Sequence, residues 1–158
     1  MRITRFEEAL LVKPAKLPDD LLKVYTVDAM SDAEGVDLCV AVPAHYTLIE
    51  KLKLISRLLN KYKFPRGLIE LKKIEQRGGK KIAVIELKET KKHPTAWRSG
   101  YFQGSCGGHI TTYILTNTFL QPDYTGKWVD GVEFWYNGKP ITGDWDHIFL
   151  HGTMYRKN

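Results

Sequence analysis

The sequence predicts a single α+β domain, in which one mixed or antiparallel β-sheet is packed by two α-helices on one face. Two observations on the pattern support this fold class. Helical periodicity covers residues 47–63 and 106–121, while the other apolar runs are short, alternate with polar residues and lie between turn signals. A third is the composition: 158 residues, 43% of them apolar and 27% charged, are typical of one globular domain.

The first 35 residues are expected to form an N-terminal extension that packs on a domain of residues 36–158. In the extension, "FEEALLV" fits a short helix or strand, and "LLKVYTVDA" has the β-branched and aromatic content of a strand. The domain then opens with "VDLCVAVP", a short apolar run that is typical of a central strand. Its Cys39 is expected to be a buried small apolar residue.

The clearest element is the helix predicted over residues 47–63. Its apolar residues recur at steps of three and four, with lysines between them: Leu48, Leu52, Ile55, Leu59 and Tyr62. Thr47 and Glu50 form a Thr-x-x-Glu capping box, in which each side chain accepts a hydrogen bond from the other residue's backbone amide. This pair therefore marks the start of the helix.

Turn residues divide the rest of the chain. "LIELKKIEQ" and "KIAVIELKE" flank a glycine turn at residues 77–80 and predict a β-hairpin. A long loop of residues 91–108 leads into the second helix, which stops near Pro122. "GVEFWYNGKPI" predicts a strand that returns at Asn137-Gly138, and "HIFLHGTMYRK" predicts a terminal strand.

Across residues 36–150, this order of elements resembles the GerMN domain of bacterial sporulation and spore-germination lipoproteins. The similar stretches are "VAVPAHYTLIEKLKLISRLL", with its proline-ended strand and Leu-rich helix, and "KIAVIEL" in the hairpin. The glycine- and serine-rich helix entry "GSCGGHITTYILTNTFLQ" and the strand "WVDGVEFWYNGKPI" complete the resemblance. It implies an α+β domain without catalytic chemistry or a cofactor. It further implies that the chain binds a protein or a cell-wall component at the bacterial cell envelope or in sporulation.

Aromatic residues concentrate in the second half of the chain, where they suit a binding surface for a glycan, a peptide or a protein. Alternation in "VEFWY" places Trp135 on the opposite face from Phe134, so this tryptophan is expected to face away from the main core. Burial beneath the long loop is the other interpretation of these aromatic residues. The expected binding residues are Trp97, Arg98, Tyr101, Phe102, His109, Trp128 and Trp135.

An enzymatic alternative rests on the His-x-Thr pattern of small 2H phosphoesterases. In that chemistry one histidine is the base and the other the acid, while the threonines hold the phosphodiester. The candidate residues are His45, Thr47, His151 and Thr153. Thr47 already serves as a helix cap, which weakens the first motif. A third motif, at residues 109–111, lies on a helix, where two residues at that spacing point in directions about 200° apart.

Two further catalytic or metal-binding arrangements are weaker hypotheses. Cys106 precedes His109 at a glycine-rich helix start, where the helix dipole would favour a thiolate. Catalytic histidines, however, usually come from a distant part of the sequence. The spacing of the candidate metal ligands is not typical of a metal site, so no metal is expected. These candidates are His109, Asp144, Asp146, His147 and His151.

The formal charge of +6 favours polyanions, but most lysines alternate with apolar residues, as they do on solvated faces of amphipathic elements. We therefore do not expect nucleic acid as a partner. No stretch reaches the roughly 18–20 apolar residues that a membrane span needs, and the N-terminus lacks the apolar core of an export signal. The compartment and the oligomeric state stay open.

Overall fold

The computed structural model describes residues 2–5, 20–28 and 30–157, and shows an α+β protein. The expected element within "FEEALLV" lies outside these residues. In chain order the elements are β1 (Arg2–Arg5), β2 (Leu21–Val27), β3 (Glu34–Ala41), α2 (Leu48–Tyr62), β4 (Leu68–Arg77), β5 (Lys80–Lys88), the π-helical turn η2 (Trp97–Tyr101), α3 (Ser105–Leu120), β6 (Gly131–Tyr136), β7 (Lys139–Pro140) and β8 (Thr153–Tyr155).

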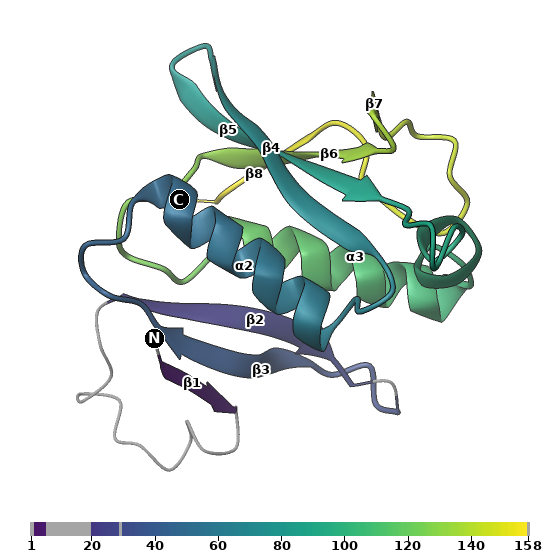
Figure 1. The fold of residues 1–158 in the computed structure, drawn as a ribbon, viewed down its shortest axis with the longest axis horizontal. Coiled ribbons are helices and arrows are strands. Elements are labelled where there is room, and N and C mark those ends of the chain that lie inside the picture. The colour runs from purple at the N-terminus through teal and green to yellow at the C-terminus, as the bar shows by residue number, and fades with distance from the viewer. Residues whose placement is uncertain (1, 6–19, 29, 158) are drawn as a thin grey trace.

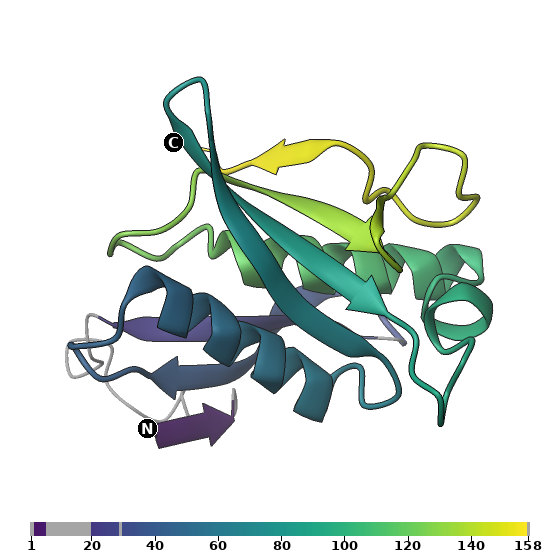
Figure 2. The ribbon, with the colours of Figure 1, turned by 45° about the horizontal axis from the view of Figure 1, so that its top comes forward.

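The strands form two sheets instead of the one that the sequence predicts. The first sheet is antiparallel, with the order β1-β3-β2. The second has the order β4-β5-β6-β7, with β8 also paired to β6, and it is mixed because β5 and β6 run parallel. Figures 1 and 2 show α2 and α3 between the two sheets, so the helices have a sheet on either side. Local patterns predict strands and turns, but they do not say where one sheet ends and another begins.

The two predicted helices are confirmed within one residue of their expected ends. At the start of α2, the Thr47 hydroxyl accepts a hydrogen bond from the Glu50 amide at 3.1 Å, and the Glu50 carboxylate accepts one from the Thr47 amide at 3.0 Å. The apolar face of α2 is buried, with Leu52, Ile55 and Leu59 fully inaccessible. The capping box and the periodicity therefore have the roles that the sequence predicts.

The predicted hairpins are confirmed as well. β4 and β5 are antiparallel from Leu68↔Lys88 to Arg77↔Lys80, and the turn residues Gly78 and Gly79 both have positive φ. β6 and β7 meet across the Asn137-Gly138 turn. The terminal strand is shorter than predicted: only its last part pairs with β6, and the preceding residues form a loop.

β2 is an integral strand of the first sheet, so the domain boundary expected near residue 35 falls inside the β2–β3 hairpin. Side chains from the C-terminal end of α3 and from its capping residue Gln121 satisfy the outer backbone edge of β2. The Lys23 amide donates to the Gln121 side-chain oxygen at 2.9 Å, and the Gln121 side-chain nitrogen donates to the Lys23 carbonyl at 2.6 Å. Two residues on, the Tyr25 amide donates to the Thr118 hydroxyl at 3.0 Å. A further strand therefore cannot pair with β2 along this stretch.

Candidate binding groove at Arg98

The expected binding surface of the long loop is partly core. Trp97 in η2 is fully buried, and its ring packs against Phe64, Tyr101 and Phe102 at centroid distances of 5.1, 5.1 and 5.5 Å. Its indole nitrogen donates to the Lys88 carbonyl at 3.0 Å. Gly67 makes room for this ring, since a Cβ there would lie 2.5 Å from the indole nitrogen.

Three of the predicted binding residues are thus corrected. Trp97, Phe102 and Trp128 are at most 7% exposed. Trp97 and Phe102 pack against each other at η2, whereas Trp128 lies between α3 and β6 and packs against the Tyr124 ring. The indole N–H of Trp128 also donates a hydrogen bond to the Phe119 carbonyl, at 2.7 Å. The alternative interpretation, that aromatic residues fill the core beneath the long loop, holds for Trp97 and Phe102, while Trp128 is part of the core near the C-terminal end of α3.

Arg98 in the same turn does reach the surface. Its guanidinium lies over the rings of Tyr136 and Trp145, at 5.6 and 5.5 Å from their centroids. Stacking on two rings limits the rotamers of an otherwise flexible side chain. Arg98 is therefore an exposed cation whose side-chain conformation is preorganised by the two rings. Tyr101, which is half-buried, carries the Arg66 guanidinium over its ring in a similar way.

Glu89 fixes η2 to the sheet. Its carboxylate, just after β5, accepts hydrogen bonds from the amides of Trp97 and Arg98 at 3.0 Å each and from the Tyr136 hydroxyl at 2.8 Å. Burial, together with this carboxylate, raises the pKa of Tyr136, so the phenol stays protonated and keeps donating. The sequence offers no signal for this role, because Glu89 looks like any charged residue at a strand end.

A groove of about 360 Å³ opens beside Arg98. Its lining comes from the turn that contains η2 and from the loop between β7 and β8: Arg98, Phe102, Gln103, Asp144, Trp145, Asp146 and His147. The lining combines one fixed cation, two carboxylates, an amide and aromatic surface. Such a set suits a polar ligand with both donors and acceptors better than a purely anionic one. The Thr142 hydroxyl lowers the pKa of Asp144, so that carboxylate is ionised at neutral pH.

A close backbone contact explains why residue 108, in the first turn of α3, is a glycine. The loop between β7 and β8 crosses α3 so closely that a Cβ on Gly108 would collide with the carbonyl oxygen of His147 and lie 2.7 Å from its carbonyl carbon. The Thr112 hydroxyl, one turn later, accepts a hydrogen bond from the Phe149 amide at 3.2 Å. The glycine therefore brings one wall of the groove against the helix.

His109 and Cys106 are exposed within the first two turns of α3. Cys39 is buried, as predicted, and burial raises the pKa of its thiol. Both cysteines are free thiols. In the described ranges, no cluster of three or more histidine, cysteine or carboxylate side chains could hold a metal ion.

The His-x-Thr residues have other partners in the structure. The Thr47 hydroxyl caps α2, whereas the Thr153 hydroxyl contacts Arg77 at 3.2 Å and Glu133 at 3.3 Å. His45 and His151 are exposed, and His45 packs edge-on against the Tyr46 ring. In both ribbon views, the loop into α2 lies at the left, while the chain enters β8 from the right. The Arg98 groove contains none of the four residues.

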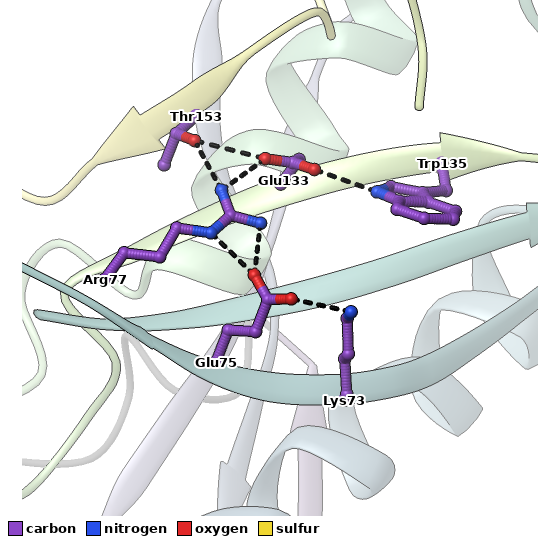
Figure 3. A network of polar contacts seen from close by, with 6 residues as sticks. All are labelled: Lys73, Glu75, Arg77, Glu133, Trp135 and Thr153. Carbon is purple, nitrogen blue, oxygen red and sulfur yellow. Dashed lines mark hydrogen bonds and ion pairs between the residues drawn. The ribbon is translucent and has the colours of Figure 1, made fainter. Parts of the chain in front are cut away.

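Trp135 faces away from the core, as alternation predicts, and lies on the outer face of the second sheet. Its indole nitrogen donates to Glu133 at 2.9 Å, and the Lys72 and Lys73 ammonium groups lie 5.0 and 5.8 Å from its ring. Figure 3 shows how Glu133 also meets Arg77, at 2.5 Å. The tryptophan belongs to a polar network that covers the sheet, so its indole N–H already has a protein partner.

This network predicts a pH-dependent contribution to stability. The Arg77 guanidinium lowers the pKa of Glu133 below the value of about 4.3 that glutamate has in an unfolded chain. The stabilisation is therefore present above that pH and is lost as pH falls through the folded pKa. We expect Glu133→Gln to lower the free energy of unfolding by about 1 kcal/mol at pH 7. Urea unfolding from pH 7 to 2 should show the two proteins converging in acid; a constant difference would contradict this.

Comparison with known proteins yields no relative. No protein-family model matches the chain. No curated protein matches it significantly. No solved structure does so either. Among the residues with a described structure, no helix combines the length and apolar character that a membrane crossing requires.

Proposed function

We propose that this chain is a non-catalytic binding module and that the Arg98 groove is its ligand site. The observation that supports the proposal is the stacked arginine: Arg98 is exposed, yet Tyr136 and Trp145 hold it in position at the mouth of a groove. Preorganised side chains bind with a smaller loss of conformational entropy than free ones. Glu89 and Gly108 also preorganise the groove: Glu89 fixes η2, and Gly108 allows the loop on the opposite wall of the groove to pack against α3.

The proposed setting, the bacterial cell envelope or sporulation, rests on the sequence resemblance to GerMN domains alone. A cell-wall fragment is the ligand class that agrees with both the resemblance and the groove. Its sugar hydroxyls and peptide groups offer donors and acceptors to Gln103, Asp144 and Asp146, and its flatter apolar surfaces can lie against Trp145. An acidic polymer fits less well, because carboxylates outnumber the fixed cations in the lining.

The test is a titration of the isotopically labelled protein with a soluble disaccharide-peptide fragment of peptidoglycan, followed by NMR. We expect shifts at the Trp145 indole and the Arg98 side chain, and at least tenfold weaker binding in both Arg98→Ala and Trp145→Ala. Arg98→Lys separates stacking from charge, since lysine keeps the charge but not the planar group. Lys127→Ala, an exposed change in the loop before β6, is the control. Equal binding by Arg98→Ala and Lys127→Ala would overturn the proposal.

A further inference from the structure

We infer that the outer edge of β4 is a second binding surface, which accepts an extended acidic peptide as an additional strand. β4 is ten residues long and lies at the end of the β4-β5-β6-β7 order, so only one of its sides pairs with β5. This surface lies across the sheet from the strand β7 and shares no lining residue with the Arg98 groove. The inference therefore goes beyond the proposed function and does not depend on it.

The pairing register shows which backbone groups of β4 point outward. In an antiparallel pair, the N–H and C=O of one residue point to the same side, and the side alternates along the strand. Ile69 points outward, because its amide donates to the Asn60 side chain at 3.0 Å. Arg77 and Lys80 close a two-residue turn, so Arg77 points toward β5. Alternation from these two anchors leaves Leu71, Ile74 and Gln76 facing outward, on either side of the irregularity between Leu71 and Lys73.

These outward groups are open, in contrast to the other long edge. The edge of β2 is closed by Gln121 and Thr118, and the beginning of β4 is closed by Asn60. Among the described residues, no side chain or loop bonds to the outward amides of Leu71, Ile74 and Gln76. An open stretch of unpaired backbone is the feature that strand addition uses.

The residues that line the groove beside this edge indicate which kind of peptide would bind there. A hollow of about 280 Å³ lies between α2 and β4, with Ile69 and Leu71 as apolar lining and Lys53 and Arg57 at its rim. These two cations are exposed, lie one helical turn apart and have no ion-pair partner in the described part of the chain. The one carboxylate of the lining, Glu70, is paired with Lys88 at 3.1 Å. In an added strand, the side chains that point toward α2 would meet both the apolar residues and these two cations, so a strand with carboxylates on that face is complementary.

A second copy of β4 is a poorer occupant. Its exposed lysines, Lys72 and Lys73, lie on the outer face beside the same edge, and an antiparallel pairing centred on them would bring the lysines of the two copies together. Like charges that face each other across a strand pair are destabilising. Lysines at a sheet edge are a common device against self-association.

The experiment uses fluorescence anisotropy with a labelled nine-residue peptide of alternating glutamate and valine, and a matched peptide of lysine and valine. We expect the acidic peptide to bind at least tenfold more tightly, with affinity that falls as salt is raised. The double variant Lys53→Glu/Arg57→Glu should abolish the preference. If the wild-type protein binds both peptides equally, the charge argument is wrong.

Backbone pairing is tested by Gln76→Pro against Gln76→Ala. Both remove the same exposed side chain, but only proline removes the outward N–H, and proline is tolerated on strand edges. We expect proline to weaken peptide binding at least fivefold relative to alanine, with hydrogen-exchange protection across β4 and β5 retained. Equal peptide binding by the two variants would overturn strand addition. Sedimentation of the protein alone is the second check: a dimer that Gln76→Pro dissociates would also overturn the proposal, because a second copy would then occupy the edge. Arg98→Ala should leave the peptide affinity unchanged, so this test and that of the Arg98 groove can fail separately.

Discussion

Trp97→Ala is expected to lower the free energy of unfolding by about 3–5 kcal/mol, the loss typical of a large aromatic residue removed from a packed core. The indole is fully buried between Phe64, Tyr101 and Phe102, and its N–H satisfies the Lys88 carbonyl. The substitution opens a cavity and leaves that carbonyl without its indole donor. Because Gly67 lies directly against the ring, little of the surrounding chain can move in to fill the space.

Chemical denaturation followed by circular dichroism measures this loss, and Trp135→Ala is the matched control. Both changes remove a tryptophan, but Trp135 lies half-buried on the outer face of the second sheet, where solvent replaces it. Its loss is expected to be clearly smaller. Equal losses would mean that Trp97 is not the centre of the core beneath η2.

Gly108→Ala is expected to destabilise the protein by about 2–3 kcal/mol, although alanine is the better helix former. The added methyl group would collide with the backbone of His147, and a backbone neighbour cannot turn away as a flexible side chain can. The loop between β7 and β8 must therefore move off α3. Since that loop carries Asp144 and Trp145, the substitution should also weaken ligand binding in the Arg98 groove.

Gly107→Ala is the control for this prediction. The neighbouring glycine lies in the same helical turn, but a Cβ there meets no atom within 4 Å. Alanine at this position should stabilise the helix by about 0.5–1 kcal/mol. Thermal unfolding of both variants, with an NMR spectrum of the Trp145 indole, separates the effects. Two stabilised variants with an unchanged indole signal would show that the loop does not depend on Gly108.

Much of the fold follows from local patterns in the sequence. The capping box of Thr47 and Glu50, the heptad-like spacing in α2 and the glycine turn between β4 and β5 each depend on residues that are close together in the chain. Such signals act independently of the rest of the fold. The division into two sheets depends instead on which hairpin packs on which side of the helices, and no short stretch carries that information.

The candidate site was predictable only in part. The long loop and Arg98 attract attention from sequence alone, and alternation correctly turns Trp135 outward. Trp97 is buried whereas its neighbour Arg98 is exposed, and the sequence does not indicate which side of a single π-helical turn faces the core. The role of Glu89 in fixing η2 could not be predicted for a related reason. It depends on three hydrogen bonds, two of them from backbone amides whose positions exist only once the turn has formed.

The closure of the β2 edge by α3 has a consequence for synthesis on the ribosome. The contact joins Lys23 to Gln121, which are 98 positions apart, so the β2–β3 hairpin emerges long before the side chains that protect it. During that interval the nascent chain presents an unpaired strand edge to neighbouring chains on the polysome, and intermolecular pairing competes with folding. Loss of the protecting amide at Gln121 should then appear first as a lower yield of soluble protein, at expression temperatures where the finished fold is still stable.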